Sequence, residues 1–166
     1  MKKTKEAFLW IIGILKKGKV PYLISGGLAA RVYGSLRHLA DIDIEIPNEY
    51  FGKILSAVKR YSVYGPKRYK DKNWDIFLLT LRYHGQLIDL SGIESGKIFD
   101  KRKNKWVKMK TDISNYNRRM VYGRFVNVSK KKDLIAYKKI IGRKVDLEDI
   151  KQISWFRVFV INNEKN

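Results

Sequence analysis

The sequence predicts a fold in which α-helices and β-strands are intermingled along one chain. Residues 41–46 alternate isoleucine strictly with a carboxylate, which is the period of a strand with one buried face. Residues 74–83 and 86–90 are two further runs rich in strand-forming residues. Over 51–58 and 134–141, apolar residues recur instead at helical spacing. These patterns indicate several strands with helices between them.

Length and composition favour one folded domain. The chain has 166 residues, of which 45% are hydrophobic, and it contains no cysteine. A buried core is therefore expected, and a disulfide framework and a thiolate metal site are excluded. We expect a single domain over 1–166, with a helical portion at about 129–160. The apolar stretch Ala7–Leu15 is too short to span a bilayer, and no cleavage site follows it. We therefore expect a cytoplasmic protein that does not enter a membrane.

A pair of glycines interrupts the first predicted strand. The apolar run before the glycines is rich in strand formers and consists of Val20, Tyr22, Leu23 and Ile24. Ser25-Gly26-Gly27 breaks this run, and 28–32 predict a short helix that Ser25 could cap. Glycines let the main chain approach a ligand closely, and the N–H groups at a helix start attract phosphate. This turn is a candidate phosphate-binding element.

Acidic residues on two predicted strands are candidates for metal binding. Asp41 and Asp43 project from one face of their strand, repel each other and call for a cation such as Mg²⁺. The alternative for this pair is an edge strand with a solvated acidic face. Asp89 lies between apolar residues on a later strand, where an unpaired carboxylate would be costly to bury. It is our candidate third ligand, with Asp75 as its local competitor.

The combination of these motifs resembles the signature of the nucleotidyltransferase superfamily, which includes polymerase beta, CCA-adding enzymes and antibiotic nucleotidyltransferases. The matching residues are Gly26-Gly27, then thirteen residues, then Asp41-Ile42-Asp43-Ile44. A Gly-Ser-x-Arg segment at 34–37 is also typical of small members. The segment 133–149 resembles the closing helices of compact members related to toxin–antitoxin and phage-defence systems. For its acids, helix capping is the alternative explanation.

The resemblance implies an α+β fold with a mixed β-sheet, helices packed mainly on one face, and the carboxylates on adjacent strands. It implies an enzyme that moves a nucleoside monophosphate from an NTP to an acceptor hydroxyl. Asp41, Asp43 and Asp89 would be catalytic and would hold Mg²⁺ or Mn²⁺, as two ions. The residues that would bind the nucleotide are Ser25, Gly26, Gly27, Arg37, Lys138 and Arg143.

The charge of the chain is extreme for its size. Thirty-six lysines and arginines against sixteen acids leave a formal net charge of +20, which favours a polyanionic partner. We expect RNA, such as tRNA, as the acceptor, in a toxin-like enzyme with an antitoxin partner. A lysine-rich composition and an anionic membrane surface are the alternatives. The candidate nucleic-acid contacts are Lys67, Arg68 and Lys70 in a predicted loop over 65–73, and Arg118, Arg119 and Arg124 in a segment that interleaves arginines with aromatics.

Other interpretations of these segments remain open. The basic loop is equally consistent with a solvated surface, and the segment around Arg118 with a hairpin of ordinary core aromatics. A small hydroxylated molecule or a protein is the alternative acceptor. A non-catalytic nucleic-acid-binding member of the fold is the third alternative, which the complete set of three aspartates disfavours.

Overall fold

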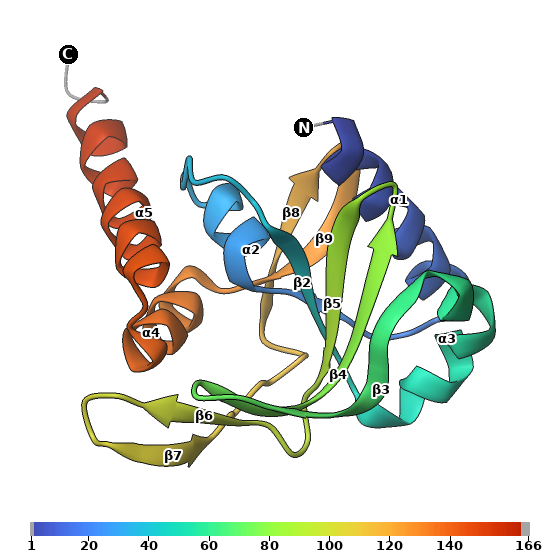
Figure 1. Ribbon diagram of the computed structural model, residues 1–166. Helices are drawn as coiled ribbons and strands as arrows, with labels where there is room; N and C mark the ends of the chain where they lie inside the picture. Colours follow the sequence, from blue (N-terminus) through green and yellow to red (C-terminus); the bar gives the residue numbers. More distant parts are fainter. Residues whose placement is uncertain (1, 164–166) are drawn as a thin grey trace.

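The computed structural model describes the backbone of residues 2–163 and the side chains of residues 2–154. The α-helices are α1 (Lys2–Lys17), α2 (Gly26–Val32), α3 (Phe51–Val58), α4 (Lys131–Ile141) and α5 (Lys144–Asn163). The strands are β1 (Leu23–Ile24), β2 (Asp41–Ile46), β3 (Ser62–Lys70), β4 (Trp74–Tyr83), β5 (Gln86–Gly92), β6 (Lys97–Asp100), β7 (Lys105–Lys108), β8 (Tyr116–Val121) and β9 (Arg124–Ser129). Helices and strands intermingle along the chain (Figure 1), so the predicted mixed α+β fold is confirmed.

The strands form one curled, nine-stranded mixed sheet (Figure 1). Its order is β7-β6-β4-β5-β2-β1-β9-β8, and β3 pairs with β4 beside this path. β2 runs parallel to β5 and antiparallel to β1, whereas β4 and β5 are antiparallel neighbours. The two strands that carry the candidate carboxylates therefore lie side by side in the middle of the sheet.

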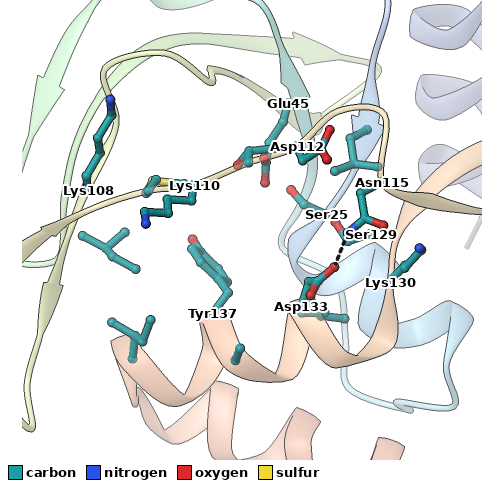
Figure 2. Close-up of a pocket in the computed structure, with 17 residues that line it drawn as sticks. Ser25, Glu45, Lys108, Lys110, Asp112, Asn115, Ser129, Lys130, Asp133 and Tyr137 are labelled. Atoms are coloured by element: carbon teal, nitrogen blue, oxygen red, sulfur yellow. Dashed lines mark hydrogen bonds between the residues drawn. The ribbon is translucent and has the colours of Figure 1, made fainter.

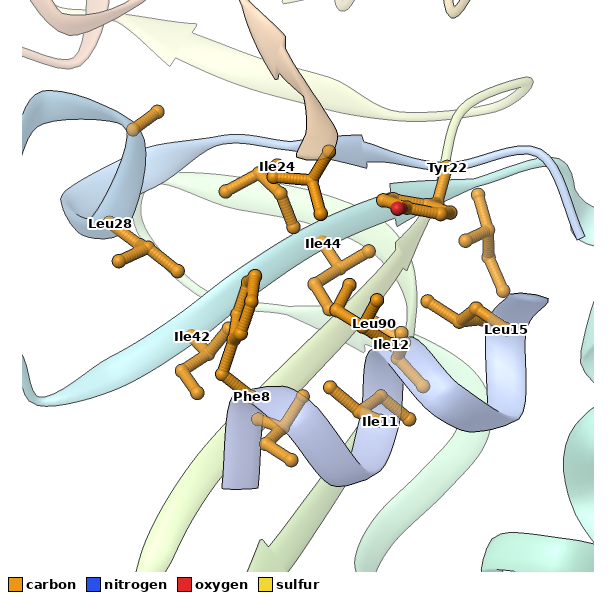
Figure 3. Close-up of a cluster of buried hydrophobic side chains, with 14 of the residues drawn as sticks. Phe8, Ile11, Ile12, Leu15, Tyr22, Ile24, Leu28, Ile42, Ile44 and Leu90 are labelled. Atoms are coloured by element: carbon orange, nitrogen blue, oxygen red, sulfur yellow. The ribbon is translucent and has the colours of Figure 1, made fainter. Parts of the chain in front are cut away.

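The main core lies between this sheet and α1. Along β2, burial alternates with the side-chain period of a strand, and Ile42, Ile44 and Ile46 are completely buried. Ile42 and Ile44 pack with Phe8 and neighbouring residues of α1 (Figure 3). Each fully buried isoleucine contributes about 1.5–3 kcal/mol through the hydrophobic effect. Because one face of β2 is held in this core, its carboxylates must project from the other face.

The helices divide between the two sides of the sheet. The main core cluster includes residues of α1, α2 and α3, together with Leu134 of α4 and Ile153 of α5. α4 also contacts α2, α5 and β6. In Figure 1, α4 and α5 stand apart from α1 and α3, on the far side of the sheet. α4 therefore faces the side from which the carboxylates of β2 project. No helix among the described residues is long and apolar enough to cross a membrane.

The prediction of a basic loop over 65–73 is wrong for most of that range. β3 extends to Lys70 and pairs with β4 from Ser62 to Lys70, with register shifts near Tyr64. Gly65-Pro66 and the many charges concealed the strand from local pattern analysis. A neighbouring strand supplies the backbone partners that the local pattern does not reveal, and charged side chains are common on edge strands.

Candidate active site

The register between β2 and β5 brings the three predicted aspartates together. Asp43 of β2 is paired directly with Asp89 of β5. Asp41 lies two residues before Asp43 on the same face of β2 and is paired with Leu87. One carboxylate oxygen from each aspartate lies within 4.8 Å of the others. The parallel pairing therefore assembles the cluster from segments that are far apart in the sequence.

The carboxylates of this cluster resist ionisation. Burial, followed by the charge of Asp41, raises the pKa of Asp43 to about 6. Burial and the charge of Asp89 raise the pKa of Asp41. Burial also raises the pKa of Asp89, with a partial offset from the Thr80 hydroxyl. Ionising these carboxyl groups in the folded chain therefore costs free energy, and a bound cation would offset that cost.

The donor set fits Mg²⁺ or Mn²⁺. Asp89 Oδ1 is shielded from solvent and has no hydrogen-bond partner among the described residues. Around one octahedral Mg²⁺, ligand oxygens lie about 3–4 Å apart, so a spread of up to 4.8 Å accommodates one ion after a small inward shift, or two ions. Asp41, Asp43 and Asp89 are therefore well placed to hold the metal.

The glycine turn packs directly onto this cluster. Gly26 has a φ of +55°, and a Cβ added to it would lie 1.7 Å from Asp43 Oδ2. The Gly27 N–H donates a hydrogen bond of 3.1 Å to the same oxygen. Ser25 occupies the N-cap position of α2, but its side chain makes no capping hydrogen bond. The turn lies beside the acids as the sequence predicts, with one of its backbone donors already used by Asp43.

A buried ionic network holds the predicted cations against the site. Lys138 is 1% exposed, and its Nζ lies 3.1 Å from Asp146 Oδ1 and 2.8 Å from Asp149 Oδ2. Arg143 Nε donates to Asp146 Oδ2 over 2.7 Å, and Arg37 Nε donates to Asp149 Oδ1 over 3.3 Å. Asp146 lies in the first turn of α5, where helix capping explains an acid, but Asp149 lies beyond that turn. Capping explains the burial of neither residue. The sequence did not reveal that Asp146 and Asp149 orient the cations.

These cations and the aspartates line one cavity of about 450 Å³. The positive charges of Arg37 and Arg143 lower the pKa of Asp41, against the larger effect of burial. Tyr69 and Trp74 add aromatic surface to the same cavity. It thus combines carboxylates, fixed positive charge and flat apolar side chains, which suits a nucleotide with its metal.

The predicted nucleic-acid contacts lie outside this cavity. They belong to β3 (Lys67, Arg68, Lys70) and to the β8–β9 hairpin (Arg118, Arg119, Arg124). In the sheet these elements are separated by four strands. Arg68 is bound to Asp75 by two hydrogen bonds of 2.6 Å, so Asp75 belongs to this ion pair and not to the carboxylate cluster. The hairpin is present, but Tyr116 is 40% and Phe125 is 51% exposed, so these aromatics are not core residues.

A second cavity, of about 360 Å³, adjoins the first. The two share Ser25, Glu45, Met109 and Tyr137. Glu45 is the third acid on the same face of β2 as Asp41 and Asp43, and sequence reasoning did not single it out. The alternation that selected Asp41 and Asp43 continues to Glu45 and was sufficient to find it.

Solved structures of other proteins share this architecture. No protein-family model matches the sequence, and no curated protein is significantly similar to it. Among solved structures, the Thermotoga maritima protein TM1012, described as a putative nucleotidyltransferase, superposes with a TM-score of 0.64 at 18% identity, covering 95% of this chain and 92% of its own. The chain has the nucleotidyltransferase fold.

Two antibiotic-modifying nucleotidyltransferases share this fold. The lincosamide antibiotic adenylyltransferase LnuA has a TM-score of 0.61 at 15% identity, covering 90% of this chain and 95% of its own. The antibiotic-resistance factor ANT(2'')-Ia has a TM-score of 0.60 at 13% identity, covering 98% of this chain and 94% of its own. The nucleotidyltransferase fold implied by the sequence motifs is therefore confirmed over nearly the whole chain.

Proposed function

We propose that this protein is a metal-dependent nucleotidyltransferase, which moves a nucleoside monophosphate from an NTP to an acceptor hydroxyl. The observation that carries the proposal is the pairing of Asp43 with Asp89 beside Asp41, on the wall of a cavity that three basic side chains also line. Carboxylates that resist ionisation, next to fixed positive charges, suit a metal-bound triphosphate. The nucleotidyltransferase fold is consistent with this activity.

The proposed roles follow from position. Asp41, Asp43 and Asp89 hold Mg²⁺ or Mn²⁺, which when bound neutralises charge on the reacting phosphate. Asp89 accepts the proton of the attacking hydroxyl, whose oxygen bonds to the α-phosphorus while the bond to the pyrophosphate oxygen breaks. Arg37, Lys138 and Arg143 supply a positive field for the triphosphate. They are held by acids, so they need little reorganisation when it binds. Ser25, Gly26 and Gly27 complete the phosphate side of the cavity.

Metal and nucleotide binding test the proposal directly. We expect calorimetry to detect saturable Mn²⁺ or Mg²⁺ binding in the presence of an NTP, and incubation with radiolabelled NTP to transfer label to an acceptor. Both should be lost when Asp41 and Asp43 are changed together to asparagine, because two of the three metal ligands then lose their charge. Metal binding of unchanged affinity in that double variant would refute the proposed role of the cluster.

RNA, such as tRNA, is one candidate acceptor, in a toxin-like enzyme with an antitoxin partner. The net charge of +20 favours it. The positions of the candidate nucleic-acid contacts do not favour RNA, because these residues lie on two separated parts of the sheet. Arg118 and Arg119 are also consecutive residues of β8, so they project to opposite faces. These residues therefore do not form one continuous basic surface that leads to the cavity.

The salt dependence of binding tests the RNA acceptor. If RNA binds through phosphate contacts, the log–log plot of affinity against salt should have a slope of about −0.7 per phosphate neutralised on a single strand. Changing Arg118 and Arg119 together to alanine should flatten the slope by roughly one or two such contacts and leave metal binding unchanged. Affinity for a tRNA mixture weaker than ~10⁻⁴ M at physiological salt would remove RNA as the acceptor.

A small hydroxylated molecule is the second candidate acceptor, and the cavity beside Glu45 favours it. Its volume of about 360 Å³ is within the range of small-molecule sites. Two proteins of the same fold have been observed with small molecules, LnuA with lincomycin and ANT(2'')-Ia with adenylyl-tobramycin. We therefore place the small-molecule acceptor first.

A further inference from the structure

The hairpin formed by β6 and β7 presents positive charge without an exposed acid. Residues 97–108 contain six basic side chains, all of them exposed: Lys97, Lys101, Arg102, Lys103, Lys105 and Lys108. The acid in this segment, Asp100, is 2% exposed, accepts hydrogen bonds from backbone N–H groups of the turn, and lies 3.8 Å from Arg102 Nε. In Figure 1 the hairpin extends from the sheet away from α1 and α3. Most of its charge is therefore free to meet a partner.

Strand pairing sets three lysines in one row across the sheet. Lys70 of β3 is paired with Asp75 of β4. Asp75 is paired in turn with Lys97 of β6, and Lys97 with Lys108 of β7. Residues that are paired across antiparallel strands share a face, so the three lysines point to the same side. Asp75 is 8% exposed and is bound to Arg68 by two hydrogen bonds of 2.6 Å, so the acid in the row is already neutralised.

Two aromatic rings form a second row beside the lysines. Phe99 and Trp106 are paired across β6 and β7, two residues along from Lys97 and Lys108, and their ring centroids lie 5.6 Å apart. Both side chains are half-buried. Lys70 Nζ lies 5.5 Å from the centroid of the Trp106 ring, so the two rows adjoin. Two residues along a strand span about 6.6 Å, which sets the separation of the rows.

This surface lies on the face of the sheet opposite to the carboxylate cluster. Trp74 and Ile98, which are next in sequence to Asp75 and Lys97, line the first and the second cavity. Because successive side chains of a strand point to opposite faces, the row of lysines points away from both cavities. Lys108 borders the second cavity, but its amino group points away from the centre of that cavity in Figure 2. A partner on this surface therefore does not need to enter either cavity.

Lysines beside flat rings favour a single-stranded nucleic acid over other anionic partners. Its phosphates are attracted by the lysines, and its unpaired bases stack on aromatic rings without regard to sequence. An acidic protein segment would use the lysines alone, and a membrane surface calls for apolar side chains that reach into the lipid, whereas Phe99 and Trp106 are half-buried. Lysines on edge strands also discourage strand pairing, but Lys97 has a paired strand on each side.

We propose that the row of lysines and the two rings bind a single-stranded nucleic acid. Its phosphates contact Lys70, Lys97 and Lys108, and its bases stack against Phe99 and Trp106. The basic turn between β6 and β7 extends the contact. The site is separate from nucleotidyl transfer, because it requires neither metal nor nucleotide and lies on the other face of the sheet.

The salt dependence of oligouridine binding tests the lysine contacts. Fluorescence anisotropy of a fluorescein-labelled oligouridine measures the affinity. Changing Lys97 and Lys108 together to glutamine removes two phosphate contacts, so affinity at physiological salt should fall about 10-fold and the log–log slope should flatten by about 1.4. The matched control changes Lys5 and Lys17 together to glutamine. Both are exposed residues of α1, so the same charge is lost elsewhere and the affinity should change far less.

Trp106 tests the stacking. Trp106→Leu should weaken oligouridine binding by at least about 5-fold, because one base loses its aromatic surface. Trp106→Phe keeps a ring and should retain most of the affinity, and denaturant unfolding checks that both variants are folded. An abasic oligomer with the same phosphates should bind the wild-type protein more weakly than oligouridine does. That comparison requires no substitution.

Four outcomes would overturn the proposal. Equal losses in the two lysine pairs would show attraction by the overall charge alone. Equal binding of the abasic oligomer and oligouridine would remove the rings from the site. Polyglutamate or phosphatidylserine vesicles that compete as well as unlabelled oligouridine would point to an acidic protein or a membrane surface instead. Displacement of oligouridine by Mg²⁺ with an NTP would place the strand in the first cavity.

Discussion

Asp43→Asn is expected to abolish nucleotidyl transfer and, at the same time, to stabilise the metal-free protein. Transfer should fall by at least about 10³-fold, equivalent to about 4 kcal/mol, because a metal ligand at the reacting phosphate loses its charge. The fold should survive, since asparagine retains an oxygen that can accept the hydrogen bond from the Gly27 N–H. A radiolabelled-NTP assay measures the first effect, and denaturant unfolding measures the second.

The gain in stability should depend on pH. The pKa of Asp43 is raised from 3.8 to about 6 in the folded chain, so the folded state binds the proton more tightly than the unfolded state does. The wild-type free energy of unfolding should therefore fall as pH rises from about 4 to about 6, by on the order of 3 kcal/mol at most. Asp43→Asn lacks this loss, so the two proteins should differ at pH 7 and converge near pH 4.

Asp75→Asn is the matched control for this experiment. Arg68 lowers the pKa of Asp75, so the same substitution should destabilise the protein near neutral pH. It should leave transfer unchanged, because Asp75 lies outside the carboxylate cluster. If Asp43→Asn is less stable than the wild type at pH 7 without metal, the repulsion assigned to the cluster is refuted.

Gly26→Ala should cost both stability and metal binding. Alanine at a φ of +55° is strained by about 1–2 kcal/mol, and its Cβ would lie 1.7 Å from Asp43 Oδ2, so the carboxylate must move. We expect a loss of more than about 2 kcal/mol in the free energy of unfolding. We also expect metal binding at least about 10-fold weaker, because Asp43 would be displaced. Denaturant unfolding and Mn²⁺ calorimetry measure the two effects.

Two other glycines separate the effect of backbone strain from the effect of displacing Asp43. Gly123 has a φ of +77° but nothing within 4 Å of an added Cβ, so Gly123→Ala should show the backbone strain alone. Gly13 is inside α1 and has open space around it, so Gly13→Ala should stabilise the protein by about 0.5–1 kcal/mol. Metal affinity should be unchanged in both. Equal losses of stability in Gly26→Ala and Gly123→Ala would contradict close packing of the turn on Asp43.

Local pattern was enough to predict the elements that carry the carboxylates. The alternation over 41–46 determines which side chains of β2 are buried and which are not, because successive side chains of a strand point to opposite faces. The break at Gly26-Gly27 and the apolar neighbours of Asp89 likewise reflect local geometry and the cost of burying a charge. The three aspartates and the glycine turn could therefore be singled out from the sequence alone.

Contacts between distant segments decided the rest. β3 became a strand because β4 supplies its backbone partners, and the basic residues on β3 and the β8–β9 hairpin were separated by the strand order. The burial of Lys138 with Asp146 and Asp149 depends on α4 closing over the sheet. Sequence spacing records periodicity along one element. It does not record which elements become neighbours, and burial and ion pairing are properties of those neighbours.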